Sequence, residues 1–318
     1  MLLAGNIVSV LKNVFAVLYL ITVFSICLMI VFENRNPVKT LAWLLVILFV
    51  PVAGLFIYIV FGRNYRKQKI FSRKSHADSV RLEASAKRQE VMLPLMLSED
   101  SMAVRSKEHL IHLMLRNNNS LLTLDNRIEL LVSGSETFPS MLDAIRSAKE
   151  FIHLEFYRIE PDNLGMQFSE LMKLKARQGV KVRVIFDDVG SWNLRKPYLK
   201  EMRAAGVQIF PYMPVRFPSF SSRINYRNHR KILIVDGKVG FVGGLNIAEK
   251  YISGLPGLGP WVDTHLRLEG EAVAALDRVF IADWDFVSRE ELHPDSSLEQ
   301  VTRTGNRCLV QVASSGPD

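Results

Sequence analysis

The chain has 318 residues, 48% of them hydrophobic, and its formal net charge at pH 7 is +8. It has only two cysteines, Cys27 and Cys308, which argues against a disulfide-stabilised secreted domain and favours a reducing compartment. A basic balance of this size suits either nucleic acid or an anionic membrane surface as the partner.

Two apolar runs occupy the first part of the chain. The runs 13–32 and 40–61 carry no charge, and each is long enough to cover the roughly 30 Å hydrocarbon core of a bilayer as a helix. Neither run has a polar face, which disfavours two buried core helices, and the first lacks the cleavage site of a signal peptide. Residues 1–62 are therefore predicted to form a two-helix transmembrane anchor.

A basic cluster follows the second run, comprising Arg63, Arg66, Lys67, Lys69, Arg73 and Lys74. By the positive-inside rule it predicts a cytoplasmic side, which places the loop 33–39 outside. Such a patch attracts anionic head groups by roughly 1 kcal/mol per residue, so its place beside an anchor favours lipid over nucleic acid. Residues 63–120 are predicted to be a largely helical connector, either on the membrane surface or as an ordinary solvated helix pair.

Strands and helices alternate after residue 120. Apolar periodicity and turn residues predict strands at 128–132, 151–159, 180–186, 207–210 and 265–268, and helices at 139–149, 163–178, 194–205 and 271–289. This alternation predicts an α/β lobe over 121–300, with a mostly parallel or mixed sheet flanked by helices. Glu155 and Asp188 are expected to face one region near the strand ends, and a structural role is an equal alternative for both.

The most informative residues are 228–246, which read NHRKILIVDGKVGFVGGLN. His229, Lys231 and Asp236 have the spacing H-x-K-x4-D. Because strand side chains alternate between faces, His229 and Lys231 are predicted to share a face of a buried strand. An imidazole beside a fixed ammonium can attack a phosphate and hold its oxygens. Asp236, also a favoured turn residue, is expected to orient this catalytic group rather than to transfer protons.

Neighbouring residues extend the candidate site. Gly244 lets the backbone approach a ligand, Asn246 can donate an amide hydrogen bond to phosphate oxygens, and Arg227 is a further candidate for phosphate binding. Asp263 is a candidate partner for the second ring nitrogen of His229, which would set the tautomer. The sequence shows no cluster with metal-ligand spacing, so no metal or other cofactor is predicted.

The motif H-x-K-x4-D followed by Gly-Gly-x-Asn resembles the phospholipase D superfamily. The segments NRNPVKTLAW, RNHRKILIVDG, FVGGLNI and WVDTHLRLEG resemble bacterial cardiolipin synthases. The resemblance implies that His229 takes a phosphatidyl group from one phosphatidylglycerol and passes it to a second, at the bacterial cytoplasmic membrane. A phospholipase D that uses water, a nuclease with the same chemistry, and an inactive membrane-tethered phosphate-binding half-domain remain alternatives.

Members of that superfamily resemble a doubled half, and each half supplies one H-x-K-x4-D. This chain has one copy, yet residues 309–318 parallel residues 128–136: an apolar strand, Ser-Gly, then an acid. Residues 301–318 are therefore predicted to begin a second catalytic lobe. The chain is then expected to be a fragment of a longer enzyme, or a natural half that pairs two copies so that two His229 side chains meet.

Overall fold

The computed structural model describes residues 12–14, 16, 17, 19, 21, 23–25, 37–50, 54, 58, 76–98, 102–215, 227–255, 257, 259, 261–290, 292 and 303–315. The chain divides into two compact units, residues 1–70 and 71–318. Each unit is described by itself.

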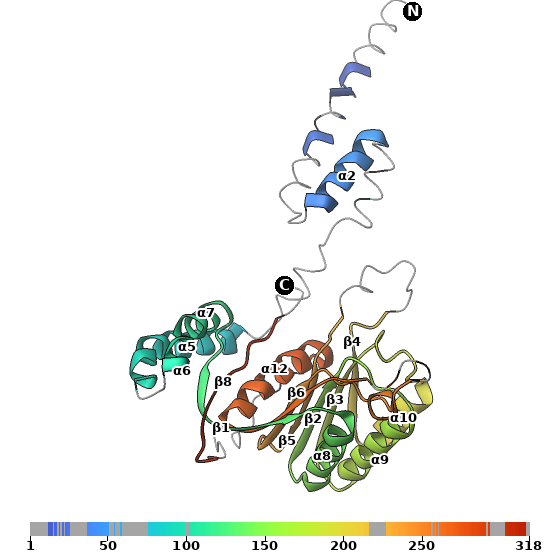
Figure 1. Cartoon of the computed structure of the whole chain (residues 1–318). Coiled ribbons are helices and arrows are strands. Elements are labelled where there is room, and N and C mark those ends of the chain that lie inside the picture. The colour runs from blue at the N-terminus through green and yellow to red at the C-terminus, as the bar shows by residue number, and fades with distance from the viewer. Residues whose placement is uncertain are drawn as a thin grey trace, which may run out of the picture. The chain divides into compact units, whose positions relative to one another are not determined.

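In the first unit, α2 (Pro37–Phe49) is a helix with apolar and mostly exposed side chains (Figure 1). Ile47 and Tyr58 are buried there and pack with Trp43. No helix among the described residues is both long and apolar enough to span a membrane. The predicted runs 13–32 and 40–61 lie partly outside the described residues, so the anchor stays a prediction.

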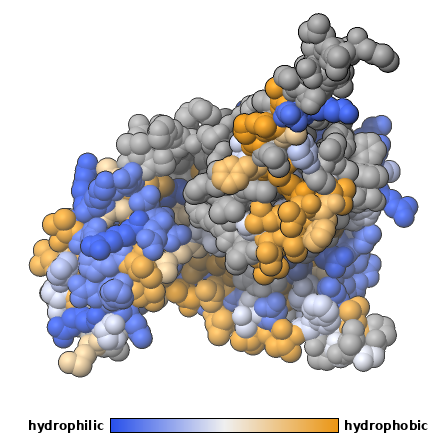
Figure 2. Space-filling model, turned by 90° about the horizontal axis from the view of Figure 1, so that it is seen from above, coloured by the Kyte–Doolittle hydropathy of each residue, from blue (hydrophilic) through white to orange (hydrophobic). Residues whose placement is uncertain are grey.

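The second unit begins with a helical group made of α5 (His76–Met96), α6 (Met102–Arg105) and α7 (Glu108–Asn118). Its apolar side chains pack against the first strand through Leu93, Leu115 and Leu122. Figure 2 shows that the outer surface on this side, at its left, is mainly hydrophilic with scattered apolar residues. The group is therefore a solvated cap on one end of the sheet.

One mixed sheet forms the centre of the second unit. Its strands are β1 (Leu122–Leu131), β2 (Phe151–Phe156), β3 (Lys181–Asp187), β4 (Gln208–Tyr212), β5 (Lys231–Val235), β6 (Val239–Gly243), β7 (His265–Gly270) and β8 (Arg307–Gln311). Their order is β4-β3-β2-β5-β6-β7-β1-β8. Only β2–β3 and β3–β4 pair in parallel, and the other pairs of this sheet are antiparallel. The expected mixed sheet is thus confirmed, although most of its strand pairs are antiparallel rather than parallel.

The connections between the strands explain why some pairs are parallel and others antiparallel. Helices separate β2, β3 and β4, as parallel neighbours require. By contrast, β5 and β6 are joined by a tight turn in which Asp236 and Gly237 have positive φ values of 52° and 63°. Strand β5 enters antiparallel beside β2, so that Phe156 pairs with Lys231. A turn of this kind reverses the chain and produces an antiparallel hairpin.

Helices cover both faces of the sheet (Figure 1). One face packs against α8 (Gly134–Ser147) and α9 (Asn163–Arg177), and the other against α12 (Glu271–Ser288). The shorter α10 (Lys196–Ala204) lies by β4, and α11 (Lys250–Ser253) lies by α8. Every residue of β2 is buried because both faces above it are covered.

The start of α8 differs from the predicted position at Pro139. The helix begins at Gly134, because the Ser133 side chain caps it by accepting a hydrogen bond from the backbone N–H of Glu136. The Glu136 carboxylate in turn accepts from the backbone N–H of Val132 at 3.0 Å. This reciprocal pairing satisfies backbone donors at a helix start and fixes the direction in which α8 leaves β1.

Candidate functional site

His229 and Lys231 lie at one end of the central strands of the sheet. Strands β2 and β3 end there and β5 begins there, because β5 runs antiparallel to β2. The Tyr157 backbone N–H donates to the Arg230 carbonyl at 2.9 Å, which continues the β2–β5 pairing one step beyond the strands. The residues before β5 therefore lie beside those that follow β2.

His229 and Lys231 meet around the ring of Tyr157. The His229 side chain is exposed and stacks on that ring with centroids 4.0 Å apart. The Lys231 ammonium is 5.3 Å from the same ring centroid and donates to the His229 carbonyl at 2.7 Å. His229 precedes β5 instead of lying in it, and Lys231 is the first residue of the strand. An accessible imidazole thus stands beside an anchored ammonium.

Lys231 is the more buried member of this pair, with 9% of its surface exposed. Burial lowers its pKa, and the nearby Asp263 carboxylate acts in the opposite direction. A partly desolvated ammonium attracts an anion more strongly than one in water, because the local dielectric constant is lower. The site is therefore suited to a phosphate that replaces water over Lys231.

A buried polar network fixes the backbone on both sides of His229. The Asn228 amide donates to the carboxylates of Glu155 and Asp283, and its side-chain oxygen accepts from the Arg230 backbone N–H at 3.0 Å. Arg230 also forms an ion pair with Asp283. Glu155 was expected near the site, and the structure places it beneath Asn228, where it is 1% exposed. Its contact with His229 is therefore indirect.

Arg227 and Asp188 have partners within the fold. The Arg227 guanidinium is 3.3 Å from the Asp187 carboxylate and donates to the Met213 carbonyl at 3.2 Å. Asp187 also accepts from the backbone N–H of Asn228 at 3.0 Å. Asp188 accepts from the backbone N–H of Val215 at 2.7 Å. Arg227 was expected to bind phosphate, but in this structure its side chain is 7% exposed and is directed at Asp187.

The glycines after β6 make room for neighbouring side chains. A Cβ atom on Gly244 would lie 1.9 Å from a carboxylate oxygen of Asp263. Asn246 uses both ends of its amide within the protein: it accepts from the Arg158 backbone N–H at 3.2 Å and donates to the Tyr251 hydroxyl at 2.8 Å. Asn246 therefore orders the loops at this edge, and Gly244 admits Asp263 rather than facing open space.

Asp263 was expected to hydrogen-bond His229. Its carboxylate instead accepts from the backbone N–H of Thr264 at 2.8 Å, and no hydrogen bond joins it to His229 in the described part of the chain. Next to it, the buried His265 accepts from the Leu245 backbone N–H at 3.3 Å. Burial and the charge of Lys231 lower the pKa of His265 to about 4, so this imidazole is neutral at physiological pH.

The structure separates Asp236 from the rest of the motif. It lies in the turn at the far end of β5, about 20 Å from His229 at the rise of an extended strand. Its carboxylate accepts from the backbone N–H groups of Lys149, Glu150 and Phe151, at 2.8, 2.8 and 2.9 Å. Asp236 thus fastens the start of β2 to the end of β5, and the expectation that it acts with His229 and Lys231 is corrected.

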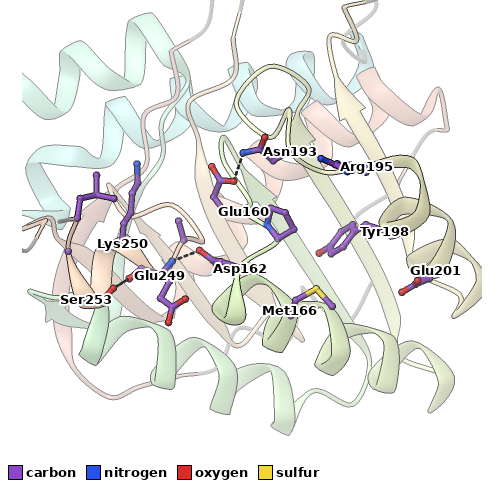
Figure 3. Close-up of a pocket in the computed structure, with 14 residues that line it drawn as sticks. Glu160, Asp162, Met166, Asn193, Arg195, Tyr198, Glu201, Glu249, Lys250 and Ser253 are labelled. Carbon is purple, nitrogen blue, oxygen red and sulfur yellow. Dashed lines mark hydrogen bonds between the residues drawn. The ribbon is translucent and has the colours of Figure 1, made fainter.

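An open pocket of about 830 Å³ lies among the loops after β2 and β3, the helices α9 and α10, and residues 248–255 (Figure 3). Glu160 projects into it and accepts from the Asn193 amide at 2.8 Å, and it also pairs with Arg158 at 2.8 Å. Lys250 lines the same cavity. Among the residues that the structure describes, no group of three His, Cys, Asp or Glu side chains could hold a metal ion.

Sequence reasoning missed Tyr157, Asn228, Asp187 and Asp283. Tyr157 follows an alternating strand, and its position next to Arg158 gave no sign of a partner more than seventy residues away. Asn228 is adjacent to His229, and its side-chain amide can both donate and accept hydrogen bonds. This capacity was the signal in the sequence that could have identified Asn228.

Parts of the chain are similar to known protein families. Residues 141–284 match the family model described as cardiolipin synthase, PLD-like domain, and residues 17–63 match the phospholipase D-nuclease N-terminal model. Residues 141–284 are thus similar to the phospholipase D-like domain of cardiolipin synthases. They include β2 to β7 and most of α12, and thus the whole of the site around His229.

Two relatives extend the similarity over nearly the whole chain. The cardiolipin synthase of Halalkalibacterium halodurans is 40% identical over 308 residues, which cover 96% of this chain and 60% of that protein. That of Alkalihalophilus pseudofirmus is 39% identical, covering 99% of this chain and 62% of that protein. The chain therefore spans about three-fifths of the length of these relatives.

Among solved structures, a phospholipase D family member, Nuc from Salmonella typhimurium, is 15% identical. The match covers 54% of this chain and all of that chain, with a TM-score of 0.39.

Proposed function

We propose that this chain supplies the nucleophile-bearing lobe of a phosphatidyltransferase that converts two phosphatidylglycerols into cardiolipin and glycerol. The observation that carries the proposal is the exposed His229 imidazole, stacked on Tyr157 beside the anchored Lys231 ammonium. The relatives that match nearly the whole chain are cardiolipin synthases, which supports this reaction over others with the same chemistry.

Two displacements at phosphorus make up the proposed reaction. A ring nitrogen of His229 attacks the phosphodiester, so that a P–N bond forms while the P–O bond to the terminal glycerol breaks. The hydroxyl of a second phosphatidylglycerol then attacks the same phosphorus, and the P–N bond breaks. Lys231 balances the charge that develops on the phosphoryl oxygens in both steps.

The departing glycerol alkoxide needs a proton, which a second imidazole is suited to provide. The same imidazole then accepts the proton that the attacking hydroxyl of the second phosphatidylglycerol loses. We propose that this imidazole comes from a second H-x-K-x4-D lobe, either in a longer chain or in a second copy of this chain. We further propose that residues 1–62 anchor the protein in the bacterial cytoplasmic membrane, with the lobe on the cytoplasmic side. This location gives the site access to phosphatidylglycerol and to other anionic lipids.

Product analysis with labelled phosphatidylglycerol tests this function. Membranes from cells that express the chain together with a complementary H-x-K-x4-D lobe are expected to yield cardiolipin, and acid-labile label is expected on His229 after rapid denaturation at alkaline pH. His229→Ala should reduce both by at least 1000-fold, since removal of a nucleophile removes the covalent route. His109→Ala, which changes an exposed histidine on α7, is the matched control and should leave both unchanged.

Other products would point to other functions. Phosphatidic acid without cardiolipin would mean that water is the acceptor, as in a phospholipase D. Lipid binding with no adduct on His229, even when a complementary lobe is added, would mean that the chain is an inactive phosphate-binding half-domain. DNA cleavage by a version that lacks residues 1–62 would favour a nuclease.

A further inference from the structure

Residues 251–262, YISGLPGLGPWV, comprise the last three residues of α11 and the connection that follows it. This stretch, called the loop 251–262 below, has no role in the proposed reaction. These twelve consecutive residues carry no charge, and they lie between Lys250 and Asp263. Glycine and proline account for five of the twelve, and most of the others are large apolar residues. A solvent-exposed connection of this length normally contains charged or strongly polar side chains.

Contacts near both ends of the loop 251–262 connect it to residues of the site. The Leu255 backbone N–H donates to the Gly259 carbonyl at 3.2 Å, and the rings of Tyr251 and Trp261 are 5.6 Å apart in an edge-on contact. Gly257 and Gly259 both have positive φ, which the narrow turn requires. Hydrogen bonding of the Tyr251 hydroxyl to Asn246 fixes one side of the base. The other side ends at Asp263, whose carboxylate faces Gly244 and influences Lys231.

Tyr251 of this loop is buried, whereas three of its large apolar side chains are exposed. Val262 is 84% exposed, Ile252 is 44% exposed and Trp261 is 40% exposed, although the fold has a large core available to apolar residues. Exposed apolar residues that gather at one place mark an interaction surface, whereas isolated ones have no special meaning. Here three such residues belong to one loop whose base adjoins His229 and Lys231 through Asn246 and Asp263.

A cation lies at the base of this apolar surface. The Lys250 ammonium is 4.2 Å from the Trp261 ring centroid and 5.5 Å from that of Tyr251. Within the described residues Lys250 forms no ion pair with a carboxylate. Burial and the neighbouring charge of Arg158 lower its pKa, and the Glu160 carboxylate acts in the opposite direction. An anionic head group close to Trp261 would add a favourable charge to this ammonium.

We propose that the loop 251–262 inserts Val262, Trp261 and Ile252 into the head-group and acyl boundary of an anionic bilayer. Lys250 then lies at the level of the lipid phosphates, and the site around His229 lies over the phosphodiesters. Tryptophan is favoured at this boundary because its ring is apolar and its N–H is polar, and a lysine at the edge contacts anionic head groups. The inference rests on the proposed function only in its choice of lipid as occupant.

A fluorescent label on Val262 tests the insertion in the full-length chain. Val262→Cys, in a Cys27→Ser and Cys308→Ser background, is labelled with an environment-sensitive dye and reconstituted in phosphatidylglycerol vesicles. Leu174→Cys on α9, where the native side chain is 47% exposed, is the matched control. We expect at least threefold less quenching by iodide at position 262 than at 174, and strong quenching by shallow spin-labelled lipid at 262 only.

Two results would overturn the proposal. Equal access of iodide to both positions would mean that the loop stays in water. Protection from iodide without quenching by spin-labelled lipid would mean that protein, such as a second copy or a second lobe, covers the loop. Lys250→Gln is expected to reduce the difference in iodide protection at position 262 between phosphatidylglycerol and phosphatidylcholine vesicles. An unchanged difference would mean that Lys250 does not contribute to the lipid-binding surface.

The same vesicles separate this inference from the proposed function. Insertion at position 262 without cardiolipin or phosphatidic acid formation, even after a complementary H-x-K-x4-D lobe is added, would leave the loop assignment intact and reject the reaction. Cardiolipin formation with a water-exposed label would reject the loop and leave the reaction intact.

Discussion

At the scale of single residues, the site depends on a second histidine, His265, that stays uncharged. His229 is exposed, whereas His265 is 1% exposed and lies near the Lys231 ammonium. Protonation of His265 would place two cations together in a desolvated region. The protein therefore keeps His265 neutral, and its Nδ1 atom accepts the hydrogen bond from Leu245.

This arrangement predicts a loss of stability in mild acid. The pKa of His265 falls from an ordinary 6.5 to about 4 on folding, so the unfolded chain binds a proton more readily. The stabilisation is complete above pH 6.5 and is lost as the pH falls towards 4, with about 2 kcal/mol lost at pH 5. The urea concentration at the unfolding midpoint should therefore be lower at pH 5 than at pH 7.5. His265→Asn, which keeps an acceptor for Leu245 but cannot ionise, should reduce this fall, and an identical fall in both proteins would contradict the prediction.

The same scale shows what the sequence could predict about the site. The spacing of His229 and Lys231 identified two groups that the structure brings together around one ring. The spacing also grouped Asp236 with them, and there it failed, because residues five apart along an extended strand lie at its opposite ends. Tyr157 and Asp283 could not be identified, since their contacts depend on how β2 and α12 pack against β5.

At the scale of elements, Asp236 explains how two strands are held in register. Its carboxylate accepts three backbone hydrogen bonds from residues 149–151, just where β2 begins. Its own φ of 52° also allows the tight turn into β6. The aspartate at the end of the motif is therefore a positioning residue that acts through β2 and β5.

Substitutions of Asp236 should affect folding before chemistry. Asp236→Ala removes all three acceptor contacts and favours a different φ, so we expect a loss of about 3 kcal/mol in the free energy of unfolding. Asp236→Asn keeps the turn conformation and one acceptor oxygen, and should lose about half as much. Urea unfolding measures both. Activity per folded molecule, measured well below the unfolding midpoint, should stay within about threefold of wild type; a 1000-fold loss in the fully folded Asn variant would restore a catalytic role.

The prediction of helices and strands was also limited to features that depend on residues close together in the sequence. Helices and strands were identified close to their observed bounds wherever apolar period and turn residues were local, as for α9 with Gly179 after its end. The direction of the strands was not predicted correctly, because the antiparallel pairing of β5 with β2 joins residues about eighty positions apart. Periodicity reports which face is buried and carries no information on the neighbouring strand.

At the scale of the whole lobe, β8 connects parts of the fold that are distant in sequence. It pairs with β1 at the outer edge of the sheet, and the Gln311 amide donates to the carbonyls of Ile111 and Ser120, at 3.2 and 2.9 Å. Arg307 donates to the Met96 carbonyl at 2.9 Å. The strand thus links the helical group α5–α7 to the sheet while covering the edge of β1.

Removal of residues 307–318 should therefore loosen one side of the lobe and spare the site. Without β8, the backbone of β1 at the sheet edge becomes unpaired and the helical group loses its contacts to Arg307 and Gln311. We expect amide exchange to accelerate at least tenfold in β1 and α7, while β2 and β5 keep their protection because α8, α9 and α12 still cover them. Gln311→Ala, which removes the side-chain bonds but keeps the strand pairing, is the control and should accelerate exchange in α7 alone. Uniform acceleration throughout the sheet of the truncated chain would instead mean that β8 stabilises the whole lobe cooperatively.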